Sequence, residues 1–288
     1  MEVQELTQTR LYKDVLRLTK VTPARNYLNI SVLNDLSDYI YQEFSRLHCQ
    51  TFFQEFTVDD RCYRNVIASF GPEKGARVVL GAHYDVAGNQ PGADDNASGV
   101  AGLLEIARLL HVSEPLKHRV DLVAYCLEEP PYFATDQMGS AFHAKCLREN
   151  NIDVKGMICL DMIGYFSDKP NSQGFPKAEY ESLYPSVGNY ILVVGRNGQE
   201  EFTKKVKKLM QDYSQIEVHD ISFSEAEKLA GFSDHRNYWK YGYPAVMICD
   251  TAYLRNPHYH KFTDIIETLN FEKMAEVVKG VFGAVVNL

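Results

Sequence analysis

Several features that define special classes of protein are missing from this sequence. None of the six cysteines belongs to a C-x-x-C pair, and Cys126, Cys159 and Cys249 lie within apolar runs, so we predict buried thiols rather than disulfides. No uncharged stretch reaches the roughly 18 residues of a membrane span. The net charge of -8 offers no basic surface for nucleic acid. We therefore expect a globular protein with neither nucleic-acid nor membrane partners.

Two further absences concern location and chemistry. Residues 1–20 contain no basic segment followed by an apolar one, the pattern of a secretory signal peptide, so a cytoplasmic location is expected. The chain has no G-x-S-x-G motif, and the adjacent Ser233, Asp234 and His235 cannot form a catalytic triad through their own side chains. A serine-hydrolase mechanism is therefore not predicted.

Apolar runs and amphipathic segments alternate along most of the chain, which is long enough for a sizeable core. Residues 6–48 are predicted to be helical, and two paired strands follow. The predicted strands are 51–56, 62–70, 78–81, 119–127, 156–161, 190–194 and 245–249, and the later helices are 97–111, 139–149, 200–213 and 271–286. This alternation predicts one α/β domain over residues 1–288 with a largely parallel sheet. The polar, proline-containing segment 167–186 is interpreted as an insertion loop.

Acids and histidines follow the predicted strands at the places where each strand ends. These residues are His83, Asp85, Asp94, Asp95, Glu128, Glu129, Asp161, His258 and His260. Ligands bind beyond the carboxyl ends of strands in such sheets, and this residue set suits a divalent metal. Asp94 and Asp95 have a second interpretation as acids at a helix start, a role that Asn96 or Ser98 could also fill.

The adjacent pair Glu128-Glu129 is the strongest of these signals. Two neighbouring carboxylates at a strand end repel each other unless a cation or a shared proton relieves the repulsion. Adjacent side chains of an extended backbone point in different directions. One carboxylate can therefore ligate a metal while the other accepts a proton from water, which is what a hydrolase requires.

In this order, His83-x-Asp85, the run from Gly92 to Gly99, Glu128-Glu129, Asp161 and His260 resemble the di-zinc aminopeptidases of clan MH, a superfamily that also contains glutamate carboxypeptidases and glutaminyl cyclases. The resemblance spans about two thirds of the chain and implies a three-layer α/β/α fold with a central mixed, mostly parallel sheet. It also implies two zinc ions per chain and a peptide substrate.

The same resemblance implies a role for each matching residue. Asp95 would bridge both metals, His83 and Asp161 would complete one ligand set, and Glu129 and His260 the other. Glu128 would be the general base, Asp85 would orient His83, and the Asp95–Asn96 peptide bond would be cis. His260 is preferred over His258 because the family ligand is followed by a few residues and an Asp, as in Lys261-Phe262-Thr263-Asp264.

The substrate pocket is predicted with less detail. The segment 130–138 is longer and richer in proline and aromatic residues than in many relatives, and it starts beside the site, so it is expected to reshape the pocket. The residues considered for the pocket are Tyr132, Phe133, Phe232, Asp234 and His235. The stretch around Asp234 is interpreted as part of the pocket or as support for the metal ligands, and a plain helix start is the other interpretation.

The predicted function is a zinc-dependent aminopeptidase with a metal-activated water. One alternative is a cyclase-like acyltransferase with a single zinc, and another is a binding module that has lost activity. A carboxypeptidase is the third, because Arg236 and Arg255 could hold a terminal carboxylate, although single arginines are expected at the surface. The sequence does not predict the oligomeric state.

Overall fold

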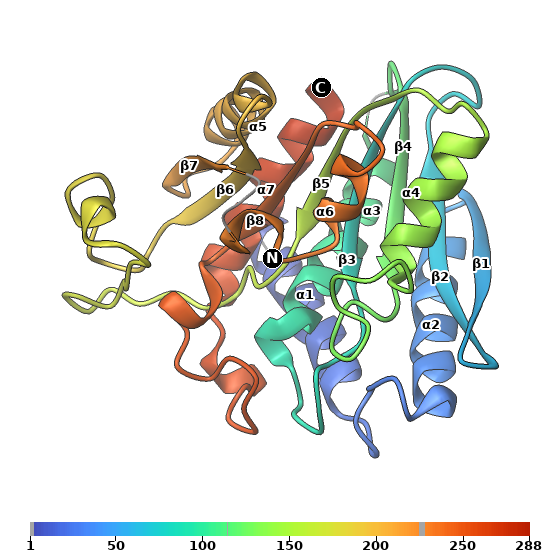
Figure 1. The fold of residues 1–288 in the computed structure, drawn as a ribbon, viewed down its shortest axis with the longest axis horizontal. Coiled ribbons are helices and arrows are strands. Elements are labelled where there is room, and N and C mark those ends of the chain that lie inside the picture. Colours follow the sequence, from blue (N-terminus) through green and yellow to red (C-terminus); the bar gives the residue numbers. More distant parts are fainter. Residues whose placement is uncertain (1–2, 114, 225–227) are drawn as a thin grey trace.

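The computed structural model describes residues 3–113, 115–224 and 228–288, which form one eight-stranded sheet with helices on both faces (Figure 1). The strands are β1 (Gln50–Val58), β2 (Arg61–Phe70), β3 (Arg77–His83), β4 (Arg119–Tyr125), β5 (Val154–Leu160), β6 (Ile191–Arg196), β7 (Val218–Phe223) and β8 (Ala245–Cys249). Their order in the sheet is β1-β2-β4-β3-β5-β8-β6-β7.

The centre of the sheet is parallel and its flanks are mixed. The central strands β4, β3, β5 and β8 run parallel to one another. Antiparallel pairs form between β1 and β2, between β2 and β4, and between β6 and β8. The predicted α/β fold with a mixed sheet is thus confirmed. Strand β7, which pairs parallel to β6 at the edge, was not predicted, because the polar residues His219 and Asp220 interrupt its apolar pattern.

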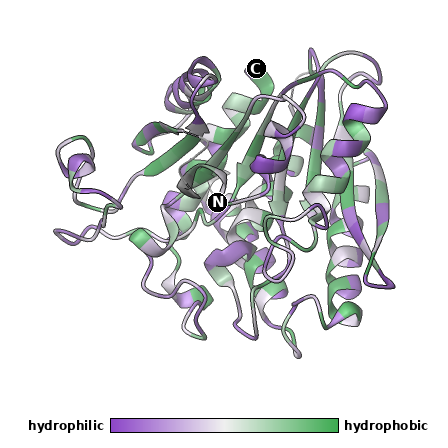
Figure 2. Cartoon of the chain, in the orientation of Figure 1, coloured by the Kyte–Doolittle hydropathy of each residue, from purple (hydrophilic) through white to green (hydrophobic). Residues whose placement is uncertain are grey.

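Two hydrophobic layers lie on opposite faces of the sheet. The helices are α1 (Val3–Thr19), α2 (Ile30–Ser45), α3 (Gly99–His111), α4 (Gly139–Glu149), α5 (Glu200–Tyr213), α6 (His235–Trp239) and α7 (Phe271–Asn287). Helices α1, α2, α3, α5 and α7 pack on one face, and α4 and α6 on the other. Figure 2 shows hydrophobic residues concentrated on the central strands and hydrophilic residues on the outer surface of α5.

Five short helical turns complete the description: η1 (Ala93–Ser98), η2 (Ala178–Ser182), η3 (Lys228–Gly231), η4 (Ala252–Leu254) and η5 (Ile266–Thr268). The segment 167–186 contains η2 and leaves the sheet between β5 and β6 (Figure 1). Within the described ranges, no helix combines the length and the apolar character needed to cross a bilayer.

Candidate metal centre

The predicted metal ligands converge at one edge of the sheet because they follow neighbouring parallel strands. His83 is the last residue of β3, Asp161 directly follows β5, and the Glu128-Glu129 pair lies just beyond β4. His260 comes from the loop after β8, and Asp95 from η1 immediately before α3. The side chains of His83, Asp95, Glu128 and Glu129 are buried, whereas that of His260 is 32% exposed.

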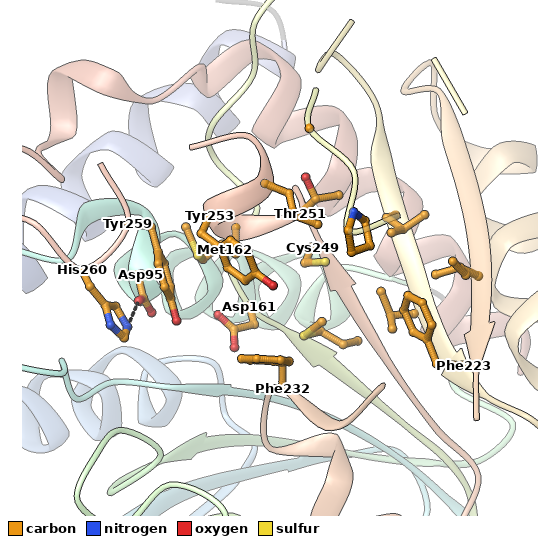
Figure 3. A pocket seen from close by; sticks show the side chains of 18 of the residues that line it. Asp95, Asp161, Met162, Phe223, Phe232, Cys249, Thr251, Tyr253, Tyr259 and His260 are labelled. Carbon is orange, nitrogen blue, oxygen red and sulfur yellow. Dashed lines mark ion pairs between the residues drawn. The ribbon is translucent and has the colours of Figure 1, made fainter. Parts of the chain in front are cut away.

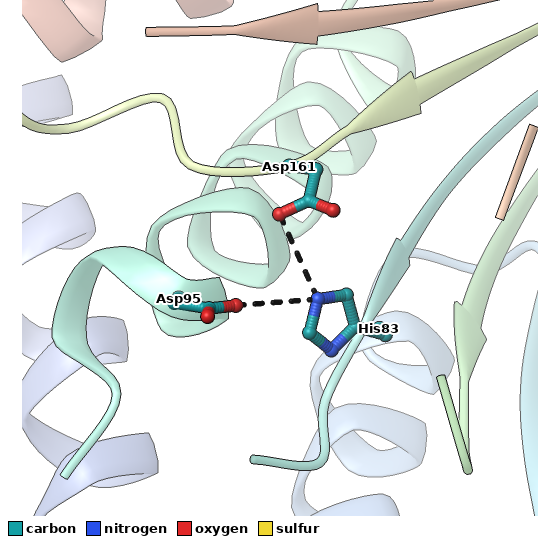
Figure 4. A group of neighbouring side chains, drawn as sticks. All are labelled: His83, Asp95 and Asp161. Carbon is teal, nitrogen blue, oxygen red and sulfur yellow. Dashed lines mark ion pairs between the residues drawn. The ribbon is translucent and has the colours of Figure 1, made fainter. Parts of the chain in front are cut away.

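A first set of donor atoms surrounds the imidazole of His83. Its Nε2 lies 3.5 Å from Oδ1 of Asp95 and 3.7 Å from Oδ1 of Asp161 (Figure 4). These distances are too long for good hydrogen bonds. One ligand atom from each residue lies within 4.8 Å of the others, so the three side chains could hold one ion.

A second set shares Asp95 with the first. Nε2 of His260 lies 3.0 Å from Oδ2 of Asp95 and 3.4 Å from Oε2 of Glu129. The two oxygens of the Asp95 carboxylate therefore face different histidines. Figure 3 shows His260 and Asp95 together at one end of the cavity described below. His258 lies outside this set, because its Nδ1 is 2.9 Å from the Thr263 hydroxyl.

Glu128 lies close enough to the cluster to be a ligand itself. Its Oε2 is 3.8 Å from Nε2 of His83, and His83, Glu128 and Glu129 form a third possible donor set. Distances alone therefore do not separate a ligand role from a proton-transfer role for Glu128.

The donor atoms fit a divalent cation. Asp95 Oδ2, Glu128 Oε1 and Glu129 Oε1 are buried and accept no hydrogen bond of good geometry. Buried polar atoms without partners are costly unless an ion or ordered water satisfies them. Histidine nitrogens with carboxylate oxygens are a donor set that zinc binds well.

The electrostatics of the ion-free cluster support the same interpretation. Burial raises the pKa of Glu128 well above its usual range, and burial together with the Asp95 charge raises the pKa of Glu129 to about 7. Burial lowers the pKa of His260, but its contacts with Asp95 and Glu129 outweigh burial and raise it to about 10. Several acids in a small buried volume thus repel one another until a cation neutralises them.

Asp85 holds the backbone of the glutamate pair. Its Oδ1 accepts a hydrogen bond from the Glu128 N–H and its Oδ2 one from the Glu129 N–H, each at 3.1 Å. Oδ1 also lies 3.6 Å from Nδ1 of His83, which is the contact that the sequence predicted. The link to the two glutamates was not foreseen, because it joins residues more than 40 positions apart.

Asp264 supports Asp95 in the same way, and no role was predicted for it. Its two carboxylate oxygens accept the N–H groups of Asp94 and Asp95 at 2.9 and 3.1 Å. Asp94 in turn accepts hydrogen bonds from the Gly164 N–H and the Asn256 side chain. The signal available in the sequence was that Asp264 lies four residues after His260.

Arg25 lies beneath the cluster and was also missed. It is 1% exposed and donates to the carbonyl oxygens of Tyr84 and Gly92. Burial lowers the pKa of its guanidinium to about 10, while the charges of Asp264 and Asp95 oppose that change. No sequence motif marks this arginine, because its partners are backbone carbonyls of a distant segment.

The turn that carries Asp95 is fixed by Asn96. The Asp95–Asn96 peptide bond is cis, as the resemblance implied. The Asn96 side chain accepts hydrogen bonds from the Gly99 and Met162 N–H groups and donates to the Leu160 carbonyl. Asn96 thus accepts the Gly99 N–H at the start of α3, which is the alternative role that the sequence offered for Asn96. The Asp95 carboxylate is left directed at the histidines.

An apolar cavity of about 270 Å³ opens from the metal cluster. Of the residues predicted for the pocket, Phe133 and Phe232 line it, with ring centroids 6.1 Å apart. Tyr132, Asp234 and His235 are not among the residues that line the cavity. The Tyr132 hydroxyl instead donates to Asp59.

Asp234 and His235 are buried behind the cavity wall at the start of α6. The Nε2–H of His235 donates to the Ala230 carbonyl, and burial lowers the pKa of this imidazole to about 4. Burial raises the pKa of Asp234 to about 7, while the charge of His83 and the Ser140 hydroxyl oppose that change.

Of the two arginines expected at the surface, one is buried and the other is partly exposed. Arg255 is 5% exposed and donates to the Gln173 side chain and the Tyr190 carbonyl. Arg236 is half-buried, donates to the Gly231 carbonyl and lies 5.2 Å from the Phe133 ring centroid. Neither lines the cavity. Hydrogen bonds and aromatic contacts compensate the two guanidinium groups for the contacts with water that they lose.

Comparison with known proteins places this site in a family. The model of Peptidase family M28 matches residues 65–285. The chain belongs to this family. It is 42% identical to the uncharacterized protein YfbL of Escherichia coli over 96% of this chain and 87% of that protein. It is 24% identical to a probable leucine aminopeptidase of Arthroderma otae over 98% of this chain and 72% of that protein.

Solved structures show the same fold at lower sequence identity. BSAP, a zinc aminopeptidase from Bacillus subtilis, aligns with a TM-score of 0.75 and 14% identity over 96% of this chain and 94% of that one. The glutaminyl cyclase of Bacteroides thetaiotaomicron aligns with a TM-score of 0.71 and 20% identity over 98% of each chain. Family membership makes the protein a hydrolase of peptide bonds, and its donor atoms suit the zinc that this family suggests.

Proposed function

We propose that the protein is an aminopeptidase that binds two zinc ions across the Asp95 carboxylate. The observation that carries this proposal is the geometry of Asp95, whose Oδ1 faces His83 and whose Oδ2 faces His260. Asp161 would complete the first ligand set and Glu129 the second. Zinc bound there would polarise the scissile carbonyl and make a water molecule more acidic.

The protein's own residues supply the remaining steps. Glu128 lies beside both donor sets and, as general base, takes the proton from the attacking water and returns it to the leaving amine. Asp85 holds the backbone on either side of this carboxylate, so its position relative to the scissile bond is fixed. The buried surroundings of Glu128 exclude bulk water from the proton transfer.

The charges around the cavity favour recognition of a free α-amino group. Its described lining includes Asp95, Glu128, Glu129 and Asp161 but no lysine or arginine. These acids can hold an ammonium group by charge-assisted hydrogen bonds, whereas a substrate carboxylate would meet no lysine or arginine side chain in the described lining. This favours aminopeptidase over carboxypeptidase action. The similarity to a probable leucine aminopeptidase agrees with this direction.

A glutaminyl cyclase with one zinc remains the competing function, because a solved cyclase shares this fold. That chemistry would use Asp95, Glu129 and His260. The additional set of His83 and Asp161 around the other oxygen of Asp95 favours a second ion and therefore hydrolysis. Metal content measured on the purified protein separates the two functions. Two zinc ions per chain are expected, and saturation at one would favour the cyclase.

Matched substitutions in the glutamate pair test the catalytic assignment. Glu128→Gln should keep both zinc ions and lower kcat at least about 100-fold, the scale of general acid–base catalysis. Glu129→Gln should instead lose zinc. The opposite pattern would exchange the two roles.

Substrate direction is tested with leucyl and N-acetyl-leucyl amides of one fluorogenic amine. Cleavage should require the free amino group. Equal cleavage of the acetylated compound would refute the aminopeptidase assignment.

A further inference from the structure

The cavity extends from the metal centre across the part of the sheet formed by β8, β6 and β7, on the face that α4 and α6 cover elsewhere. Its floor consists of alternate residues of three adjacent strands: Leu192, Val194, Ile221, Phe223, Met247 and Cys249. Alternate residues of a strand point to the same face, so these six side chains form one continuous apolar surface. On the opposite face, β6 and β8 pack in the main core.

The segment 167–186 forms a roof over this floor. Its Phe175, Tyr180 and Tyr184 line the cavity. The roof is fixed to β7 by a hydrogen bond from the Tyr184 hydroxyl to the Asp220 carbonyl and by edge contact of the Tyr180 and Phe223 rings at 6.2 Å. These contacts hold the roof at the end of the cavity that lies away from the metal centre.

The roof is also fixed beside the metal centre. Gln173 donates to the Thr251 hydroxyl, and the Gly174 N–H donates to the Leu254 carbonyl at 2.7 Å. Both partners belong to the loop that follows β8 and leads to His260. The cavity is therefore bounded on two sides by segments that pack against each other, rather than by a single exposed loop.

The size of the cavity exceeds what a leucine side chain fills. Its volume of about 270 Å³ is nearly twice the ~150 Å³ of a cavity that binds benzene. Three strand spacings separate β5, which precedes Asp161, from β7, so β7 lies roughly 14 Å sideways from the strand that leads to the metal centre. Figure 3 shows Phe223 at the opposite end of the cavity from Asp95 and His260.

The side chains at the distal end of the cavity, away from the metal centre, favour binding of an apolar group. The residues that line this end on β6 and β7 carry no charge and no polar side-chain atom. A peptide backbone placed on this floor would meet no polar side chain of β6 or β7, and burying N–H and C=O groups without partners is strongly unfavourable. A hydrocarbon or aromatic group would instead be stabilised by every methylene that leaves water.

We infer that the preferred substrates carry a large apolar N-terminal side chain, aromatic or unbranched, that is longer than leucine and ends between the β6–β7 floor and the tyrosines of the roof. This inference rests on the proposed aminopeptidase function. The α-amino group would remain at the acids of the metal centre, and the side chain would extend over Cys249 toward Ile221. The distal floor and the roof would then set the side-chain preference.

A chain-length series tests the inference with one leaving group. Alanyl, leucyl, 2-aminohexanoyl and 2-aminooctanoyl amides of a coumarin amine are compared with the zinc-loaded protein. Each methylene that enters the cavity should raise kcat/KM about fourfold, so the octanoyl compound should exceed the hexanoyl compound about 15-fold. A plateau or a fall beyond leucine would overturn the inference.

Two tryptophan variants locate the effect. Ile221→Trp fills the distal floor and should remove the gain of the 2-aminooctanoyl over the leucyl amide, while an unchanged circular dichroism spectrum and zinc content show that the variant folds. Leu183→Trp adds the same side chain at a roof position that is 66% exposed and does not line the cavity, so it should behave like the unmodified protein. Equal effects of the two variants would refute the assigned location.

Binding without turnover separates failure of this inference from failure of the proposed function. Calorimetry with butylamine, hexylamine and octylamine on chelator-treated protein should give affinity that rises with chain length and a selective loss for octylamine in Ile221→Trp. If no aminoacyl amide is cleaved but the amines show this trend, the aminopeptidase assignment fails and the apolar site stands. If alanyl and leucyl amides are cleaved but neither rate nor affinity rises with length, only the inference fails.

Discussion

Replacing Asp85 by Asn should weaken zinc binding without removing a ligand. The carboxylate accepts N–H groups from Glu128 and Glu129 at 3.1 Å each and lies 3.6 Å from His83. An asparagine side chain keeps one oxygen, and its amide group would face the other N–H as a second donor. One charge-assisted hydrogen bond is lost and one buried N–H is left without a partner.

The magnitude follows from those two changes. A hydrogen bond to a charged group contributes about 1.5–3 kcal/mol, and an unsatisfied buried donor costs about 1–3 kcal/mol. We expect the free energy of unfolding of the metal-free protein to fall by roughly 2–4 kcal/mol, since the two terms overlap. Loss of a group that orients metal ligands typically lowers metal affinity about 10- to 100-fold.

Chelator competition measures zinc affinity, and urea unfolding in the presence of chelator measures stability. Asp121→Asn is the matched control, because Asp121 is equally buried, on β4, and accepts hydrogen bonds from Ser69, Arg77 and Arg119 away from the metal centre. The control should lose stability and keep its zinc affinity. If Asp85→Asn also keeps its zinc affinity, Asp85 does not position the ligands and the reasoning is refuted.

Two other substitutions test the surroundings of the site. Burial lowers the pKa of His235 to about 4, against roughly 6.5 in the unfolded chain. The neutral imidazole therefore contributes stability that is complete above pH 6.5. This contribution falls by up to about 3 kcal/mol as the pH drops toward 4. His235→Gln can still donate a hydrogen bond to the Ala230 carbonyl. In this variant the free energy of unfolding, measured with urea, should fall less between pH 7 and 4.5 than in the unmodified protein. An equal fall in both proteins would contradict the burial argument. Gly81→Ala would place a Cβ within the Tyr125 ring, so unfolding free energy should fall by about 1–3 kcal/mol, with weaker zinc binding because His83 follows two residues later. Unchanged stability in that variant would mean that the ring moves aside freely.

The fold was largely predictable where local patterns repeat. Strand 245–249 and the helices 139–149 and 200–213 have the predicted bounds, because their apolar residues recur at the period of the element. The start of α3 was placed two residues early, because η1 continues into it without a break in composition. Strand β7 was missed because His219 and Asp220 interrupt its apolar pattern, and its pairing with β6 and its contact with the roof are not visible in the sequence.

The residues of the candidate site also divide into those that the sequence could predict and those that it could not. Chemistry restricts metal ligands to a few residue types, so the histidines and acids near strand ends could be named as candidates, and the family resemblance then singled out His83, Glu129 and His260. The roles of Arg25 and Asp264 could not, because both act through hydrogen bonds to backbone groups, which leave no trace in residue identity. The direction of Asp234 could not be predicted, because Asp234 lies between η3 and α6 and only tertiary packing decides which side its carboxylate faces.

The sequence by itself determined which atoms can bind a cation and that helices alternate with strands, because both depend on residue identity and local period. Only the tertiary structure decided that the two oxygens of Asp95 face different histidines, since that geometry depends on the contacts of Asn96 and Asp264 across the fold. It also decided the length of the cavity. The floor on β6–β8 and the roof at Tyr180 and Tyr184 come from segments distant in sequence, and their separation is set by packing rather than by any local pattern.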